Sequence, residues 1–111
     1  MTILKVPGVR KPLPVRSIVW TAGDDSYAHL YFLNGQHYTI TRTLKWFVLQ
    51  LPDFVRLHKS ILVNPVHVTD CQREQPRSAL VTVRTGTTFP VAHRRVEGVV
   101  KSLQPTKTDP P

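Results

Sequence analysis

The stretch Phe54-Val55-Arg56-Leu57-His58-Lys59-Ser60-Ile61-Leu62-Val63-Asn64 combines an apolar frame with a basic tip. Its apolar members are suited to a hydrophobic core: Phe54, Leu57, Ile61, Leu62 and Val63. Between them stand side chains that all donate hydrogen bonds, namely Arg56, His58, Lys59 and Ser60. Apolar residues on both sides of such a tip would hold its donors rigidly toward an anion. We therefore expect two short strands, 54–58 and 61–64, joined at Lys59-Ser60.

The whole chain is basic. It has 111 residues, enough for one domain that buries roughly two-thirds of its unfolded surface. Its 15 Lys and Arg against 7 Asp and Glu give a formal charge of +8, which favours a polyanionic partner, although a basic surface without a partner is the simpler alternative. The lone Cys71 excludes an intramolecular disulfide. The chain contains no apolar run of about 18 residues, the length that predicts a membrane span. We therefore expect a cytoplasmic protein without a membrane partner.

The N-terminal half predicts an arm, three strands and a helix. Residues 1–14 form a basic, proline-rich arm. Such an arm can lie along a phosphate backbone, but a frayed terminus is the interpretation that we favour. β-Branched and aromatic residues predict strands at 15–22, 27–33 and 36–40, separated by turn residues at 23–26 and Asn34-Gly35. Helical spacing follows in Leu44, Phe47, Val48 and Leu51, with Thr41 or Thr43 as the cap and Pro52 as the stop.

The C-terminal half predicts more strands and a second helix. Asn64 is expected to fix the turn before Pro65, and strands are expected at 66–70, 79–84 and 88–91. Residues 72–78 are expected to form a polar loop. Helical spacing returns in Val96, Val99, Val100 and Leu103, and residues 104–111 predict a disordered tail. The fold class is therefore mainly β, with many short antiparallel strands and two short helices, and the domain proper spans 15–103.

No group of residues predicts catalysis or a metal site. His67 and Cys71 have no second ligand pair, while His29 and His37 flank a hairpin without a nearby carboxylate in sequence. Beside His58 and Ser60 there is neither an acid nor an oxyanion loop, and the chain has no glycine loop for a phosphate. We expect no enzyme activity, no cofactor and no small-molecule substrate.

Three turns could instead carry hydrogen-bond donors to nucleic acid: Asp25-Ser26-Tyr27, His58-Lys59-Ser60 and His93-Arg94-Arg95. Phosphates and guanine edges both accept hydrogen bonds, so donors on rigid loop tips can position and read DNA. A helix-turn-helix needs two adjacent helices, whereas the two expected here stand about forty residues apart. Any reading of DNA would therefore come through loops.

The order of these features resembles the LytTR family of DNA-binding domains of bacterial response regulators. The resemblance spans Ile18 to Leu103 and is carried by Leu44 through Pro52, Phe54-x-Arg56-x-His58-x-Ser60-x-x-Val63-Asn64, strand 79–84, Gly86 and Pro90-Val91-Ala92-His93-Arg94. It implies about ten strands in three antiparallel sheets. It also implies sequence-specific binding of double-stranded DNA in transcription regulation, with loop residues entering two successive major grooves. A pair of domains on repeated or two-fold sites would suit the family.

Carried over by position, the resemblance gives Tyr27, Lys59 and His93 the places of base-contacting residues. Arg94 is a further base-contacting candidate, because the family usually has Ser-Arg where this chain has Ala92-His93. Phosphate contacts would fall to His58, Ser60, Arg56 and Arg95. Lys59 stands where Arg or Asn is common, and lysine is a point charge rather than a bidentate fork.

Structural alternatives remain for several of these residues. Arg56 could pair with a surface carboxylate, and His58 could satisfy backbone groups around its turn. Trp20 and Trp46 are expected in the core. A small RNA-binding or protein-interaction module is the alternative function, because Tyr27 and Tyr31 on an exposed sheet face would favour base stacking. A receiver domain needs about 120 residues of its own, so phospho-aspartate control within this polypeptide is not expected.

Overall fold

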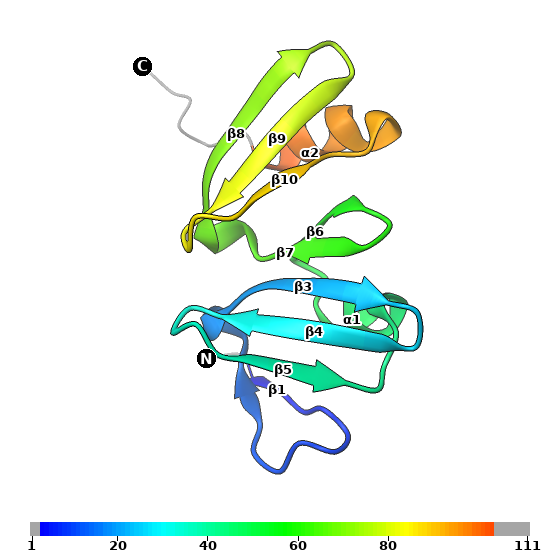
Figure 1. The fold of residues 1–111 in the computed structure, drawn as a ribbon, viewed down its shortest axis with the longest axis vertical. Helices are drawn as coiled ribbons and strands as arrows, with labels where there is room; N and C mark the ends of the chain where they lie inside the picture. Colours follow the sequence, from blue (N-terminus) through cyan, green and yellow to red (C-terminus); the bar gives the residue numbers. More distant parts are fainter. Residues whose placement is uncertain (1–2, 104–111) are drawn as a thin grey trace.

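The computed structural model describes residues 3–103, which form ten strands and two α-helices (Figure 1). The strands are β1 (Ile3–Leu4), β2 (Leu13–Pro14), β3 (Ile18–Asp24), β4 (Tyr27–Phe32), β5 (His37–Ile40), β6 (Val55–His58), β7 (Ile61–Val63), β8 (Val68–Gln75), β9 (Ser78–Val83) and β10 (Thr88–Pro90). The helices are α1 (Leu44–Gln50) and α2 (Val96–Leu103). Three antiparallel sheets have the orders β1-β2, β5-β4-β3-β7-β6 and β10-β9-β8. This confirms the mainly β fold class.

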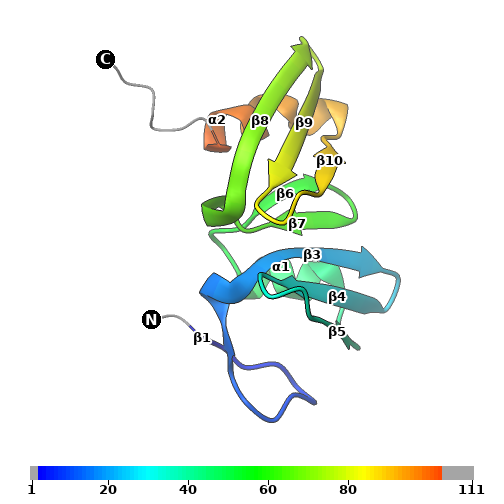
Figure 2. The same cartoon turned by 60° about the vertical axis from the view of Figure 1, so that its left-hand side comes forward.

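The five-stranded sheet lies between two hydrophobic cores. Ile18 and Leu62 pack into one core with α1, whereas the neighbouring Val19, Ile61 and Val63 pack into the other with α2 and the β8–β10 sheet. Because both faces of β3 and β7 are covered, their apolar residues are contiguous rather than alternating. The five residues of the 54–64 stretch expected in the core (Phe54, Leu57, Ile61, Leu62 and Val63) are all buried, whereas Val55 is half-buried. Two views show the β8–β10 sheet at one end of the molecule and the N-terminal ribbon at the other (Figures 1 and 2).

Both predicted helices are confirmed. Thr43 caps α1, since its Oγ1 accepts a hydrogen bond from the Trp46 amide at 3.3 Å. The apolar stripes face the cores: Leu44, Phe47 and Leu51 are buried, and so are Val96, Val99 and Leu103. Helices of this length depend on such packing for their stability. No helix within residues 3–103 is long and apolar enough to cross a bilayer.

Several element boundaries differ from the sequence-based expectation. β8 continues through Gln75, so the expected loop at 72–78 shrinks to a tight turn at Pro76-Arg77. Its residues 72–75 are exposed and polar, so no apolar alternation in the sequence predicts a strand there, but their backbone pairs with β9. β3 extends to Asp24, which leaves Asp25 and Ser26 as the turn. Short 3-10 helices occupy Val15–Ser17 and Pro65–His67, where strands were expected.

Within the described residues 3–14, the N-terminal arm is packed rather than frayed. β1 and β2 pair with each other, and Leu4, Val6 and Leu13 are buried in the core that contains α1. Pro7 and Pro12 fall in the connecting loop, and Pro14 lies in a two-stranded ribbon, where a missing amide donor is tolerated. Leu4, Val6 and Leu13 therefore hold the arm in place. The predicted tail at 104–111 lies outside the described residues.

Asn64 has the structural role expected of it. Its Oδ1 accepts from the Val66 amide at 3.2 Å, which fixes the turn, and its Nδ2 donates to the Ile18 carbonyl at 2.9 Å. The same amide thus ties the end of β7 to the start of β3. Trp20 and Trp46 pack against the two hydrophobic cores, as expected.

Candidate nucleic-acid interface

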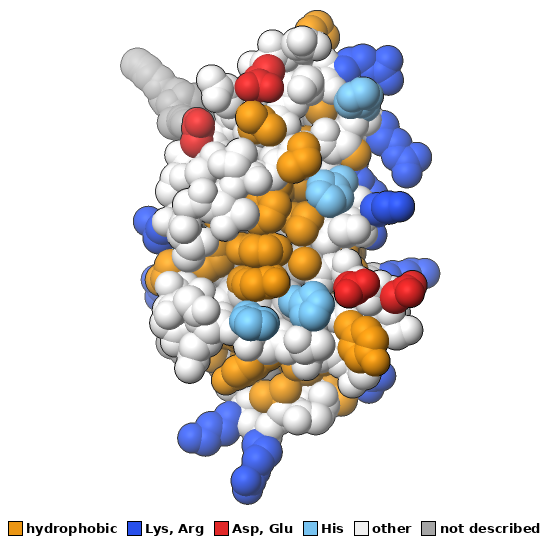
Figure 3. Space-filling model, in the orientation of Figure 1, with side chains coloured by type: hydrophobic (Ala, Val, Ile, Leu, Met, Phe, Trp, Pro, Cys, Tyr) orange, Lys and Arg blue, Asp and Glu red, His pale blue; other side chains and the backbone are white. Residues whose placement is uncertain are grey.

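The three predicted tips lie along one long edge of the molecule (Figure 1). They are the β3–β4 turn, the β6–β7 hairpin and the 3-10 helix His93–Arg95 that precedes α2. The β8–β9 turn lies at the end of the same edge (Figure 1). Lys and Arg side chains follow this edge, interrupted by acidic groups near the β3–β4 turn (Figure 3). We call it the basic edge, defined by Tyr27, Arg56, His58, Lys59, Ser60, Arg77, His93, Arg94 and Arg95.

The β6–β7 hairpin is held by hydrogen bonds that leave the Lys59 side chain exposed. A register shift between Arg56 and His58 lets the Arg56 side chain fold back onto the turn. Its Nε donates to the His58 carbonyl at 3.3 Å and its Nη2 to the Lys59 carbonyl at 2.7 Å. From the other side, the Gly23 amide donates to the Ser60 carbonyl at 2.8 Å. The Lys59 backbone is therefore fixed while its ammonium group faces solvent.

His58 serves this turn with one ring nitrogen. Its Nδ1 accepts a hydrogen bond from the Ser60 amide at 3.2 Å, so the proton of the neutral ring belongs on Nε2. Burial lowers the pKa of His58, and the neighbouring charges of Arg56, Arg95 and Lys59 lower it further. The ring is thus held neutral, with an Nε2–H that has no partner within residues 3–103. The structural role considered for His58 is present, and its second nitrogen is left to donate.

Arg56 does not pair with a carboxylate in the described part of the chain, contrary to the alternative considered above. The ion pairs there join Arg73 to Glu97 and His29 to Asp24. Burial and the charge of Arg95 lower the pKa of Arg56. Arg56, Arg94 and Arg95 line a shared hollow of about 400 Å³ whose lining residues include no carboxylate. Arg56 also lines a neighbouring hollow with Asp24 and Asp25, so an anionic partner is favoured only on the side that it shares with Arg94 and Arg95.

The tip before α2 is bonded directly to strand β6. The Ala92 amide donates to the Leu57 carbonyl at 2.9 Å, and the Arg95 amide closes the turn on the Ala92 carbonyl at 2.8 Å. His93 and Arg94 are exposed beyond this anchor. The β6–β7 and His93–Arg95 tips therefore keep a fixed relation to each other.

Sequence reasoning missed Arg77. It stands in the β8–β9 turn and lines a hollow of about 630 Å³ together with His58, His93 and Arg94. The expected loop at 72–78 concealed it, because a residue inside an irregular loop has no predictable direction. The Pro76-Arg77 pair, between the polar run 72–75 and the apolar strand that begins after it, was the signal for a tight turn that could have placed Arg77.

The Tyr27 tip has a mixed charge. Tyr27 is 48% exposed and follows the turn residue Asp25, whose φ of 58° is left-handed. A hollow of about 490 Å³ beside this turn is lined by Asp24, Asp25, Lys45 and Lys59. The structure thus brings Tyr27 to the same edge as the basic tips, but places two carboxylates between them.

The remaining polar candidates are structural. His67 is buried, with Nε2 2.5 Å from the Arg16 carbonyl oxygen and Nδ1 accepting from Arg84 Nε at 3.3 Å. Burial raises the pKa of the Cys71 thiol. Across β4 and β5, His29 faces Thr39 while His37 faces Tyr31, so the two histidines do not pair. No group of metal-binding side chains occurs in the described residues. His29 does have a carboxylate nearby, Asp24, at 3.9 Å.

Tyr31 is not free to stack on a base. Trp20 stacks on its ring at a centroid distance of 3.8 Å, and the His37 ring is also stacked with it at 5.4 Å. Of the two tyrosines considered for RNA stacking, only Tyr27 is classed as exposed. Both faces of the Tyr31 ring are therefore occupied by its neighbours on β3 and β5.

The chain thus forms a small, mainly β domain with a cationic edge built from turns. A family model described as the LytTr DNA-binding domain matches residues 9–104, so the chain belongs to the LytTR family of DNA-binding domains. A solved Bacillus cereus structure described as a LytTr DNA-binding domain shares the fold, with a TM-score of 0.74, 22% identity and coverage of 92% of this chain and 94% of that one. No curated protein matches the sequence. The resemblance inferred from the 54–64 stretch is confirmed.

Proposed function

We propose that this domain binds double-stranded DNA at specific sequences, by inserting the tips of its basic edge into the major groove, and so regulates transcription. The observation that carries the proposal is the fixed Lys59 turn, whose exposed ammonium group stands between the tips at Tyr27 and His93. The molecule is 44 Å along its longest axis. Successive major grooves on one side of DNA are about 34 Å apart, and the proposal places tips from different parts of the basic edge in two of them.

Base contacts are assigned to Tyr27, Lys59, His93 and Arg94. An ammonium or a guanidinium group can donate to guanine N7 and O6, and the guanidinium does so with two parallel bonds. Arg94 is therefore expected to discriminate more sharply than Lys59. The Tyr27 hydroxyl and a ring N–H of His93 are the donors that the other two side chains offer.

Phosphate contacts are assigned to His58, Ser60, Arg56 and Arg95. His58 Nε2–H and the Ser60 hydroxyl stand on the same fixed turn as Lys59, so they would set its register on the backbone. Arg56 uses Nε and Nη2 within the turn, which leaves Nη1 for a phosphate oxygen. Arg95 shares a hollow with it and adds a second cation.

The decisive experiment selects bound duplexes from a random pool and then measures affinity for the selected duplex and for a shuffled one. Lys59→Ala and Arg94→Ala should each weaken binding to the selected duplex by about tenfold, with the melting temperature nearly unchanged. Lys5→Ala, an exposed cation on the N-terminal ribbon, is the matched control and should bind normally. A large loss of stability in the Lys59 or Arg94 variants would mean that these residues hold the fold instead.

Two further features of the proposal have simple tests. Preference for single-stranded RNA over duplex DNA in competition would favour the alternative of an RNA-binding module. The stoichiometry can be measured on two duplexes, one with repeated half-sites and one with a single half-site. Two domains on the first duplex and one on the second would support pairing of this chain on DNA. Equal stoichiometry on both duplexes would exclude it.

A further inference from the structure

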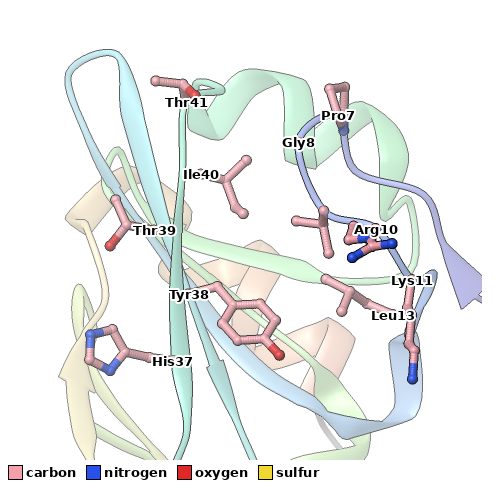
Figure 4. A pocket seen from close by; sticks show the side chains of 11 residues that line it. Pro7, Gly8, Arg10, Lys11, Leu13, His37, Tyr38, Thr39, Ile40 and Thr41 are labelled. Atoms are coloured by element: carbon pink, nitrogen blue, oxygen red, sulfur yellow. The ribbon is translucent and has the colours of Figure 1, made fainter.

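A second groove lies at the end of the molecule that carries the N-terminal ribbon, away from the β8–β10 sheet (Figures 1 and 4). It measures about 700 Å³. One wall is the loop between β1 and β2, at residues 7–11, together with Leu13, and the other wall is β5 with Thr41. None of the residues assigned to DNA contact lines it.

The β5 wall offers unpaired backbone groups. β5 is the edge strand of the five-stranded sheet, paired on one side with β4. The Phe32 amide donates to the Gln36 carbonyl at 2.9 Å, and the register continues through Tyr38 opposite Leu30 and Ile40 opposite Ala28. Alternate residues of an antiparallel strand bond to opposite sides. The amide and carbonyl groups of His37 and Thr39 therefore point away from β4, along the open edge of the strand that lines the groove.

The side chains around the groove combine two kinds of contact. Arg10 and Lys11 are exposed and have no ion-pair partner within residues 3–103. Val9 on the loop and Tyr38 on the strand add partly exposed apolar surface, whereas the lining residues Leu13 and Ile40 are buried; Figure 4 shows the labelled ones. A strand that alternates acidic and apolar residues would match this lining, because its two faces present different side chains.

We infer that the groove binds an extended acidic segment of a partner protein, which adds to β5 as a further strand. Outward amide and carbonyl groups of an edge strand are the usual template for such addition. A phosphate backbone fits less well, because phosphates accept hydrogen bonds but cannot satisfy the outward carbonyls of His37 and Thr39. Since the groove lies apart from the basic edge, the domain could hold DNA and this segment together.

The test uses the complete chain and two synthetic peptides, Ac-Val-Glu-Val-Glu-Val-Glu-NH2 and its Val-Lys counterpart, followed by amide NMR. The acidic peptide should shift the His37 and Thr39 amide signals and bind at least about tenfold more tightly than the basic one. Thr39→Pro removes the outward amide donor where an edge strand tolerates proline, and should abolish the shifts at His37. Thr39→Val keeps that donor and should bind normally.

The double variant Arg10→Glu/Lys11→Glu should lose the acidic peptide and keep its affinity for the selected duplex. The inference is overturned if the acidic peptide leaves the His37 and Thr39 signals unchanged, or if both peptides bind equally. It is also overturned if the double variant loses duplex DNA while its peptide shifts persist, because the loop would then belong to the DNA interface.

Discussion

Arg56 Nη2 donates a hydrogen bond to the Lys59 carbonyl oxygen at 2.7 Å, so that one cation of the basic edge fixes the backbone of the next. Arg56 Nε reaches the His58 carbonyl in the same turn at 3.3 Å. A planar guanidinium can span two carbonyl groups in this way, whereas an ammonium group is a single point of donation. The direction of the Lys59 side chain therefore depends on Arg56, three residues earlier in the chain.

Arg56→Lys should weaken binding to the selected duplex although the net charge stays the same. The lysine cannot bridge both carbonyls, so the Lys59 turn loses an anchor, and we also expect a loss of about 1 kcal/mol in the free energy of unfolding. Arg95→Lys is the matched control, because Arg95 shares the hollow with Arg56 but has no side-chain hydrogen bond in the described residues. Equal affinities for the two variants would show that Arg56 acts through charge alone.

The pH dependence of stability should include a contribution from His58. Its pKa is lowered in the folded protein, so the unfolded chain takes up this proton first as the pH falls. The contribution of the neutral ring is complete above the ordinary histidine pKa of about 6.5 and is lost as the pH decreases below it. His58→Asn keeps an acceptor oxygen near the place of Nδ1 without titrating. Urea unfolding from about pH 5 to 8 should show a weaker acid destabilisation in this variant than in the unsubstituted chain, and identical profiles would contradict the assignment.

Gly23 is expected to be intolerant of a side chain. A Cβ at this position would lie 2.7 Å from Leu44 Cβ, at the point where α1 packs on β3. Gly23→Ala should therefore reduce the free energy of unfolding by about 1–3 kcal/mol, and it should also disturb the Lys59 turn, because the Gly23 amide bonds to Ser60.

Gly98→Ala, in helix α2, provides the matched comparison. No atom lies within 4 Å of a Cβ added there, and alanine favours a helix interior by about 1 kcal/mol. This variant should be more stable in the same denaturation experiment. Similar losses in both variants would refute the contact with Leu44.

The sequence predicted the Lys59 tip and both helices because each follows from a local pattern. Apolar residues on either side of a polar turn define the hairpin, and spacings of three and four define the helices. The predicted strand ended before the observed β8 does, because residues 72–75 are exposed and polar and only their pairing with β9 makes them a strand. The packing of the arm likewise depends on Leu4, Val6 and Leu13 meeting a distant core. The bond from Arg56 to Lys59 depends on a register shift in β6, which no spacing of residue types reveals.

Arg77 should contact a phosphate beyond the His93 tip. It lines the same hollow as His58, His93 and Arg94, yet it stands on the separate β8–β9 turn at the end of the basic edge. A phosphate contact carries no sequence information, so Arg77→Ala should weaken binding to the selected and the shuffled duplex alike. It should also reduce the salt slope, the slope of log affinity against log salt concentration, by about one. Lys59→Ala should instead weaken binding to the selected duplex more than binding to the shuffled one.

Arg73→Ala separates this contact from a general effect of charge. Arg73 lies on the same hairpin, but its guanidinium is paired with Glu97. Its removal should leave the salt slope unchanged, because a cation already neutralised by a carboxylate displaces few counterions from DNA. If both arginine variants lower the slope equally, the hairpin attracts DNA through its overall charge and Arg77 makes no contact of its own. If only Arg77→Ala lowers it, the DNA interface extends across four turns of the chain, of which the sequence revealed three.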